Sequence, residues 1–202
     1  ARRFDRADWV YAATNGEDGS RPPDPPSRHY PWAGQLISRS GWDRDANWSF
    51  FDAGPDGTGH QHNDKLHLSV YAHGRTILSD SGKFAYAGTV ARKYRYTYAL
   101  HPRGHNVVMI DGMGQNATEH RAETPHKAFG ITDTFDFALG TYGNGFSKDP
   151  VLASQTNCMS DDDRPKSLTN PDLPGSHTRA VIHLRNMGWL VVDRLRAQGE
   201  HT

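Results

Sequence analysis

Two histidines one residue apart, His60 and His62, are the residues whose type and spacing best suit chemistry in this sequence. Side chains alternate along an extended strand, so both imidazoles lie on the same side of the backbone and can serve one site. Asp80 and His105 follow further along the chain. Imidazole and carboxylate are ligands that zinc and related divalent ions accept. We therefore predict a metal and active-site centre carried on β-structure.

The candidate ligands are far apart in sequence, so the site depends on how the strands pair. His60 or His62, together with Asp80 and His105, can converge if the hairpin ending near Asp80 and a strand starting at His105 are neighbours in one sheet. The alternative is that these are surface or hydrogen-bonded histidines that bind no ion. The spacing alone leaves both interpretations open.

A second kind of chemistry is suggested by a segment rich in tyrosine and arginine, residues 83–100. A tyrosine can act as general acid or base when a nearby cation lowers the pKa of its phenol. The segment and its surroundings contain such pairs: Tyr86, Tyr94, Tyr96 and Tyr98 with Arg92, Arg95 and His101. Packing is the alternative role of any one tyrosine. Four polar residues are expected to hold turns and loops rather than to react: Asn63, Asp64, Lys65 and Asn106.

Composition narrows the classes of protein. Lys plus Arg (23) equals Asp plus Glu (23), so no net positive field marks a nucleic-acid-binding protein. The single cysteine, Cys158, excludes an internal disulfide framework and thiolate zinc sites, so any metal is held by nitrogen and oxygen. No apolar run approaches the ~20 residues of a membrane span, and residues 1–20 lack the apolar core of a secretion signal. Both ends of the chain look cut.

A length of 202 residues suits one packed domain, which we place at residues 30–202. Residues 1–29 are expected to be a polar, proline-rich linker or the tail of a preceding domain. Within them, a surface loop is favoured over a helix for residues 1–20. The proline-rich stretch 21–27 cannot form a helix or an inner strand, because proline lacks the amide donor and has a fixed φ.

Many short strand patterns follow, with no stretch of helical period, and predict an all-β fold, an antiparallel β-sandwich. The expected strands cover 35–40, 46–52, 66–72, 76–78, 105–112, one or two within 129–139, 178–184 and 189–195. Residues 66–72 and 76–78 read as a hairpin, with Leu66, Leu68 and Val70 on its buried face. Residues 83–100 are expected to form a loop over a site, and 149–176 a long excursion.

Several motifs in order resemble the heparinase II/III family of polysaccharide lyases, in its C-terminal β-sandwich portion. They span roughly residues 30–115 and 177–201. The matching residues include Gly34, the Arg39 to Trp42 run, the Phe51 to Pro55 run, the Gly59 to Leu66 run, Gly74, the Asp80 to Gly82 run, Tyr86, the Arg92 to Tyr98 run, His105, Asn106, Asp111, Gly112, Gln115, the His177 to Arg179 run and the Val191 to Arg194 run.

The resemblance implies a set of roles. In that family the second histidine of the pair, the aspartate closing the hairpin and the histidine before asparagine bind a zinc-like ion, which maps to His62, Asp80 and His105. His60 would face the substrate. Tyr86 is the first candidate for the tyrosine beside the sugar, and Tyr98 the second. Two further residues are assigned to substrate binding: Arg92 and Asn106.

The implied reaction is β-elimination on a uronic-acid-containing polysaccharide, with zinc, or another divalent ion such as manganese, in an organising role. The resemblance also implies a preceding α/α-toroid domain that completes the active site, an acidic polysaccharide substrate, and a periplasmic or secreted setting. The sandwich alone would be catalytically incomplete.

Two other functions fit parts of the sequence. A cupin-like metal-dependent oxygenase or isomerase is suggested by the His60 and His62 pair and the later His105, but the cupin pattern calls for a glutamate after the pair, where only Asp64 is available. A non-catalytic carbohydrate-binding sandwich is the third hypothesis.

Overall fold

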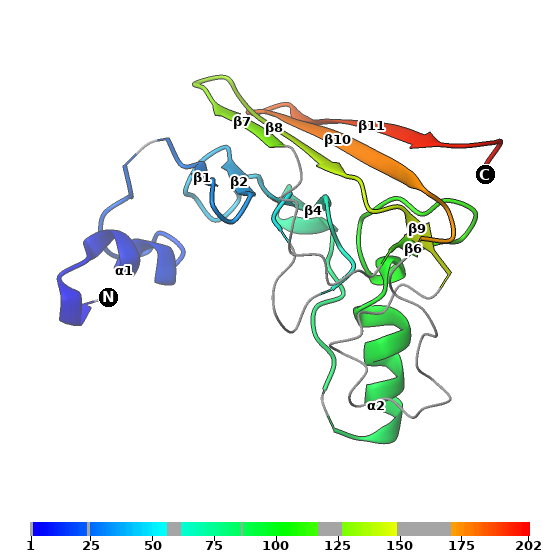
Figure 1. Ribbon diagram of the computed structural model, residues 1–202. Coiled ribbons are helices and arrows are strands. Elements are labelled where there is room, and N and C mark those ends of the chain that lie inside the picture. Colours follow the sequence, from blue (N-terminus) through cyan, green and yellow to red (C-terminus); the bar gives the residue numbers. More distant parts are fainter. Residues whose placement is uncertain (1, 24, 56–61, 86, 117–126, 149–170) are drawn as a thin grey trace.

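The structure, a computed structural model, describes residues 2–23, 25–55, 62–85, 87–116, 127–148 and 171–202. Two antiparallel sheets form the main body. Figure 1 shows one of them, built from strands within residues 127–142 and 175–197, running along one side of the molecule. Their arrangement confirms the predicted all-β antiparallel sandwich. Among the described residues, no helix combines the length and the apolar character needed to cross a bilayer.

The first sheet has the strand order β1-β2-β3-β4-β5. Its strands are β1 (Arg28–Tyr30), β2 (Gln35–Arg39), β3 (Trp48–Asp52), β4 (His67–Ala72) and β5 (Arg75–Leu78). Each strand pairs antiparallel with the next, so the sheet is a simple meander. The expected strands at 35–40, 46–52, 66–72 and 76–78 are thereby confirmed, and the last two form the expected hairpin.

The second sheet has the order β11-β10-β8-β7. Its strands are β7 (Lys127–Ile131), β8 (Phe135–Tyr142), β10 (Gly175–Leu184) and β11 (Gly188–Ala197), and a small two-stranded sheet pairs β6 (Gly114–Gln115) with β9 (Phe146–Ser147). The predicted strands within 129–139, at 178–184 and at 189–195 are confirmed. The 149–176 excursion lies largely outside the described residues, as does Cys158.

The hydrophobic core lies between the two sheets. The first sheet and the loop before β4 contribute most of it, and the second sheet adds a few residues from β8 and β10: Leu36, Phe51, Ala53, Leu66, Leu68 and Val70, with Ala138, Tyr142 and Val181. A polar bond also joins the layers, since Trp189 Nε1 donates to Ser49 Oγ at 2.9 Å. The expected burial of Leu66, Leu68 and Val70 is confirmed.

Strand β10 does not present an apolar face to this core. Its inward-facing residues are His177, Arg179, Val181 and His183, all less than 9% exposed, while Ala180 and Ile182 point to the other side. Three of the four inward side chains are therefore polar or charged. His177 and Arg179 both bond Asp193, whereas neither ring nitrogen of His183 makes a hydrogen bond among the described residues.

Two segments expected to be loops are helical. Residues 83–100 contain α2 (Thr89–Tyr94) and the π-helical turn η2 (Arg95–Ala99), and residues 1–20 contain η1 (Arg2–Phe4) and α1 (Ala7–Ala13). Neither helical stretch contains glycine or proline, so nothing in the backbone opposes a helix. Figure 1 places α1 and α2 outside the two sheets.

The strand expected at 105–112 is absent. After the 3₁₀ turn η3 (Pro102–Gly104), residues 105–109 have no regular structure, and the chain forms only a bridge between Ile110 and Met113 around the turn at Asp111 and Gly112. The reason is that side chains take the hydrogen bonds of this backbone: Asn106 N–H donates to His67, and Asn106 C=O accepts from Arg179.

Gly140 on β8 allows the two sheets to approach closely. A Cβ at this position would lie 2.5 Å from Leu66 Cδ2 and 2.7 Å from Ala53 Cβ. We expect Gly140→Ala to lower the free energy of unfolding by about 1 to 3 kcal/mol through overpacking, measured by urea denaturation. The matched control is Gly130→Ala on the neighbouring strand β7, where the new Cβ meets nothing within 4 Å. Equal effects of the two substitutions would contradict the close sheet packing.

Candidate metal and active-site centre

A buried hydrogen bond between His105 and Asp80 forms the centre of the candidate site. His105 Nδ1 lies 2.7 Å from Asp80 Oδ2, the His105 side chain is fully buried, and that of Asp80 is 34% exposed. Asp80 Oδ1 accepts the Gly82 N–H at 2.6 Å. Because a carboxylate only accepts hydrogen bonds, Nδ1 of His105 carries the proton in this pair. The other ring nitrogen, Nε2, is buried and meets no hydrogen-bond partner among the described residues.

His62 and Asp64 lie on another side of the His105 ring. The ring centroids of His62 and His105 are 5.1 Å apart. One ligand atom from each of His62, Asp64 and His105 lies within 4.8 Å of the others, and His67, Asp80 and His105 form a second group within the same limit. His105 belongs to both groups, so it is the residue that joins them.

The hydrogen bonds of His67 determine whether it can be a ligand in the second group. Its Nδ1 accepts the Asn106 N–H at 3.1 Å, so a neutral ring carries its proton on Nε2. That Nε2 lies 2.7 Å from Ser69 Oγ and 3.5 Å from Asp80 Oδ2. His67 therefore has no free lone pair to offer to an ion in this arrangement, and it supports Asp80 instead.

The segment that carries His62 and Asp64 is fixed to its surroundings by backbone hydrogen bonds. Asn63 N–H donates to Leu100 C=O at 3.0 Å, and the Gln115 side chain bonds both the N–H and the C=O of Lys65, at 2.9 and 2.6 Å. Leu66, at the end of the segment, has φ of 68°, which is rare for a bulky residue and costs on the order of 1 to 3 kcal/mol. The turn directs the chain into β4.

The segment that carries His105 is equally constrained. Gly104 N–H donates to His101 C=O at 2.9 Å, and Ser81 N–H donates to Gly104 C=O at 3.1 Å. A Cβ on Gly104 would lie 2.5 Å from Tyr98 O and 2.8 Å from Ser81 Oγ, so only glycine fits there. His105 is thus held next to the end of the β4–β5 hairpin by loop packing. The expected convergence by pairing within one sheet does not occur.

The electrostatics of the cluster follow from burial and proximity. Burial lowers the pKa of His62, and the opposing effect of Asp64 does not compensate. Burial likewise lowers the pKa of His67, although Asp80 opposes it. At Asp80 burial raises the pKa, but hydrogen bonds from His105 and Gly82 outweigh it and hold the value at about 2.

The pKa of His105 shifts in the opposite direction to the pKa values of His62 and His67. Burial alone would lower its pKa, but the hydrogen bond to Asp80 prevails and raises it, with smaller contributions from Asp64 and the Ala99 carbonyl. At neutral pH the cluster therefore combines neutral His62 and His67, an ionised Asp80, and an imidazole that holds its proton unusually well.

These residues fit a divalent ion. All donors are nitrogen or oxygen, and the buried Nε2 of His105 is a donor atom that the described protein leaves unused. Ligands on one tetrahedral zinc lie about 3.4 Å apart, given metal–ligand distances near 2.0 to 2.1 Å. The donor atoms of His62, Asp64 and His105 lie within 4.8 Å of one another, which is compatible with that spacing. Asp80 supplies the carboxylate that often orients a ligating histidine.

The other predicted site residues are distributed as follows. His60 and Tyr86 lie outside the described residues, so their roles stay predictions. Tyr98 sits on η2 with 44% of its surface exposed, and Arg92 is exposed on α2. These two residues are thus accessible to a ligand from solvent.

Asn106 has a structural role. Its side-chain Nδ2 donates to Leu68 C=O at 3.0 Å and to Ser79 C=O at 2.9 Å, so both amide hydrogens link β4 to the end of β5. This agrees with its expected role in holding neighbouring loops. Its assignment to substrate binding stays a prediction, and in this conformation only the amide oxygen is available for it.

Sequence reasoning missed several members of the site. His67 was expected on the exposed face of its strand but is 3% exposed, and Asp64 was expected only to hold a turn. Arg95 is 5% exposed and is one of the charges that lower the pKa of His62. Arg179 and Asp193 belong to motifs that carry the family resemblance, and that was the one signal of a role for them.

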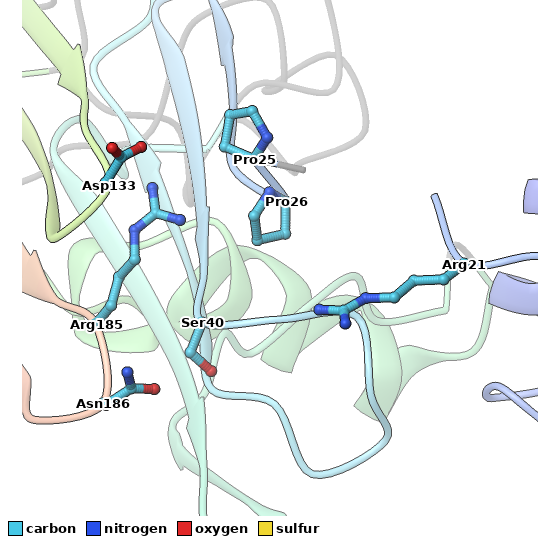
Figure 2. A pocket seen from close by; sticks show the side chains of 7 residues that line it. All are labelled: Arg21, Pro25, Pro26, Ser40, Asp133, Arg185 and Asn186. Carbon is cyan, nitrogen blue, oxygen red and sulfur yellow. The ribbon is translucent and has the colours of Figure 1, made fainter. Parts of the chain in front are cut away.

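A pocket of about 410 Å³ lies elsewhere (Figure 2). It is lined by Arg21, Pro25, Pro26, Ser40, Asp133, Arg185 and Asn186, and Figure 2 shows Arg21 and Arg185 approaching it from opposite sides. None of the predicted site residues lines it. Arg185 follows the end of β10 and is six residues from Arg179, roughly 20 Å along a strand. The pocket and the histidine cluster are therefore at different ends of the sandwich.

The Asp80–His105 bond can be tested by titration. We expect Asp80→Asn to lower the pKa of His105, because the main interaction that opposes burial is removed and only the smaller effects of Asp64 and the Ala99 carbonyl still oppose it; NMR of the histidine rings in chelator-treated protein measures this. Asp111→Asn is the control, since Asp111 bonds His201 Nδ1 at 2.7 Å and should change only the pKa of His201. An unchanged His105 titration in Asp80→Asn would show that the bond does not form in solution.

The same pair makes stability depend on pH. The lowered pKa of Asp80 gives a contribution that is present above its unfolded value of about 4 and lost as pH falls towards 2. The raised pKa of His105 gives one that is present below about 6.5 and lost as pH rises through the folded value. The pair is therefore expected to stabilise the fold most between about pH 4 and 6.5.

Comparison with known proteins places the chain in a family. A family profile described as "Heparinase II/III-like, C-terminal" matches residues 22–202. A heparin-sulfate lyase of Pedobacter heparinus is 26% identical over 193 residues, which are 95% of this chain and 24% of that protein. A heparin-sulfate lyase of Bacteroides stercoris is 27% identical over 109 residues, 54% of this chain and 16% of that protein. The chain thus spans about a quarter or less of these relatives.

Solved structures agree on the fold. The crystal structure of heparan sulfate lyase from Pedobacter heparinus matches with a TM-score of 0.69 at 23% identity, over 98% of this chain and 26% of that one. A crystal structure of heparinase III matches with a TM-score of 0.63 at 16% identity, over 98% and 27%. The profile match gives no support to the cupin-like alternative. The chain belongs to the heparinase II/III-like family and corresponds to its C-terminal domain.

Proposed function

We propose that this chain is the C-terminal domain of a polysaccharide lyase that cleaves a uronic-acid-containing polysaccharide by β-elimination. The observation that carries the proposal is that His62 and Asp80, two of the residues that the family resemblance assigns to one ion, each lie next to the third, the buried His105. Relatives named heparin-sulfate lyases support an acidic glycosaminoglycan such as heparan sulfate as the substrate class.

In β-elimination, a base removes the proton beside the uronate carboxylate, and the glycosidic oxygen on the neighbouring carbon leaves with its bonding electrons. A carbon–carbon double bond forms between the two carbons, and an acid protonates the leaving oxygen. The proton is weakly acidic, so the developing charge on the carboxylate must be stabilised by fixed donors or cations. A tyrosine or histidine suits the proton transfers.

The chain's own residues divide these tasks. His60 is assigned to the substrate side of the histidine pair, Tyr86 is the first candidate for the acid or base, and Tyr98 is the second, with an exposed position that leaves its ring accessible. Arg92, exposed on α2, is assigned to the substrate's acidic groups. Arg95 adds a buried positive charge next to His62, which favours an anionic ligand nearby.

A zinc or manganese ion is proposed to be held by His62 and His105 with a carboxylate from Asp80 or Asp64. When bound, the ion supplies a fixed positive charge that organises these loops. Nitrogen and oxygen ligands scattered over separate segments couple ion binding to local folding. His67, Asn106 and Ser69 hold the Asp80 side of the site whether or not an ion is bound.

Two parts of the proposal concern the protein beyond this chain. Because the chain spans 24% of the Pedobacter heparinus relative, we propose that a companion N-terminal domain, an α/α-toroid by family resemblance, completes the active site. We also propose a periplasmic or secreted location, where an acidic polysaccharide is accessible. The sandwich alone is then expected to bind the ion but not to turn over substrate.

Product formation tests the reaction. We expect the full-length protein to generate ultraviolet absorbance from an unsaturated sugar on heparan sulfate, and less or none on alginate, hyaluronan or ulvan. His60→Ala and Tyr86→Phe should each reduce the rate by at least about 100-fold, because they remove a proton-transfer or positioning group. His73→Asn, on an exposed turn with φ of 53° that asparagine tolerates, is the control. Polysaccharide binding without any new chromophore would favour the carbohydrate-binding alternative.

Ion content tests the ligand assignment. We expect His62→Ala to lower zinc affinity at least about 10-fold, because it removes a ligand, and Asp80→Asn to lower it also, because it removes a ligand or the partner that orients His105. The measurement is metal content after dialysis, by plasma mass spectrometry, with His73→Asn as control. Full ion content in His62→Ala would exclude this residue as a ligand. Comparing Asp64→Asn with Asp80→Asn then identifies the ligating carboxylate.

A further inference from the structure

Arg179 crosses from the second sheet to the loops that carry the histidine cluster. It lies on the inward face of β10 and is 7% exposed. Its Nη1 donates to two backbone carbonyls of the opposite layer, Leu66 C=O at 2.8 Å and Asn106 C=O at 2.5 Å. One guanidinium group therefore joins two chain segments that are 40 residues apart.

The two carbonyls belong to the immediate neighbours of cluster histidines. Leu66 precedes His67, and Asn106 follows His105. The N–H of Asn106 also donates to His67 Nδ1, so His67 and Arg179 bond the N–H and the C=O of the same residue. Through these contacts Arg179 fixes the separation of the backbones that carry His67 and His105, the two rings that flank Asp80.

Arg179 is itself held by Asp193 of the neighbouring strand β11, and His177 in turn holds Asp193. Its Nε donates to Asp193 Oδ1 at 2.7 Å and its Nη2 to Asp193 Oδ2 at 3.1 Å, a two-point contact. His177 Nε2 lies 2.6 Å from the same Oδ1 and is fully buried. The guanidinium group of Arg179 thus bonds a carboxylate on one side and two backbone carbonyls on the other. A lysine cannot reproduce this set of contacts.

We propose that Arg179 and Asp193 are positioning residues of the candidate ion site. They set the geometry of His105 and Asp80 from the opposite sheet, and so they determine how tightly the ion is held. Among the described residues, none of their hydrogen bonds reaches a candidate ligand of the ion, so we expect their effect to pass through the Leu66 and Asn106 backbone. The effect on ion affinity rests on the proposed function, whereas the effect on ring positions does not.

The chain contains a matched comparison at the other end of β10. Arg185 Nη2 donates to Asp136 Oδ1 at 2.6 Å, and their side chains are 10% and 0% exposed. Asp136 also accepts from Ser27. The two arginines are similarly buried, at 9% and 10% exposed, whereas Asp193 is 32% exposed and Asp136 is not exposed at all. Among the described residues, the hydrogen bonds of Arg185 and Asp136 involve no member of the histidine cluster. Arg185 lines the pocket of Figure 2.

The experiment compares Arg179→Met, Arg179→Lys and Asp193→Asn with Arg185→Met in the full-length protein. Zinc affinity is measured by competition with a chromophoric chelator, and stability by urea denaturation. We expect Arg179→Met and Asp193→Asn to weaken zinc binding roughly 10- to 100-fold, the range for residues that orient ligands, with only partial rescue by Arg179→Lys. Arg185→Met should lose stability while zinc affinity stays within about twofold.

A second readout separates this inference from the proposed ion site. Histidine Cε1-labelled, metal-free protein is expected to show shifted His105 and His67 resonances in the Arg179 variants and unshifted ones in Arg185→Met. If the unsubstituted protein binds no zinc, the proposed ion site fails, and the ring shifts alone decide the positioning role. The positioning role would be overturned by unchanged His105 and His67 resonances in the Arg179 variants, or by an equal loss of zinc affinity in Arg179→Met and Arg185→Met. Should Arg179→Met not fold, Arg179→Lys and Asp193→Asn decide the same comparison.

Discussion

The structure depends on the polar inward face of β10. A sandwich core normally receives apolar side chains from each strand, but here His177, Arg179 and His183 point inward with Val181. Removing one partner of a buried ion pair typically costs about 3 to 5 kcal/mol, because the other charge is left without compensation. The neighbouring strands must therefore supply carboxylates at fixed positions, and they do so at Asp193 on β11 and Asp136 on β8.

The two carboxylates, Asp136 and Asp193, connect the second sheet to different parts of the chain. At one end of β10, Asp136 receives Arg185 and Ser27, which fastens the segment before β1 to the second sheet. Near the middle of β10, Asp193 holds Arg179, and the guanidinium group reaches the loops around Leu66 and Asn106. The attachment of the segment before β1 and the proposed positioning of the histidine cluster thus rest on separate pairs, Arg185 with Asp136 and Arg179 with Asp193.

The cluster itself lies on irregular backbone, which normally carries more freedom than a strand. Freedom is removed here by side chains that bond backbone groups: Gln115 on Lys65, Arg179 on Leu66, and His67 and Arg179 on Asn106. A site whose supporting groups are themselves fixed keeps its ligands in place before a ligand arrives. This explains how residues from loops 40 positions apart form a defined group.

The sequence was sufficient for most strands, because Leu66, Leu68 and Val70 alternate with polar residues in a pattern that only a half-buried strand produces. Motifs rather than spacing selected His62, Asp80 and His105; the structure places His62 and Asp80 each near His105 but in two different candidate groups, and their role as ligands stays a prediction. Pairing within one sheet was the wrong mechanism for their convergence. The backbone after Gly104 hydrogen-bonds to side chains from distant strands, and alternation carries no information about such contacts.

The alternation of apolar and polar residues also gave the wrong burial for a residue that is buried because polar partners satisfy it. His67 follows a buried leucine and was expected at the surface, yet it is buried because Asn106, Ser69 and Asp80 satisfy it. Helix α2 was missed because its face toward the rest of the chain is not apolar: none of Thr89–Tyr94 is buried, so no hydrophobic period marks it.

The raised pKa of His105 connects the electrostatics of the cluster with the proposed ion. Without an ion, Asp80 stabilises a proton on His105 in a site that burial would otherwise keep neutral. A divalent cation placed among His62, Asp64 and His105 meets the same nearby carboxylates, and it needs the lone pair that the second proton of His105 would occupy. Proton and cation are therefore alternative ways to balance the same negative charge.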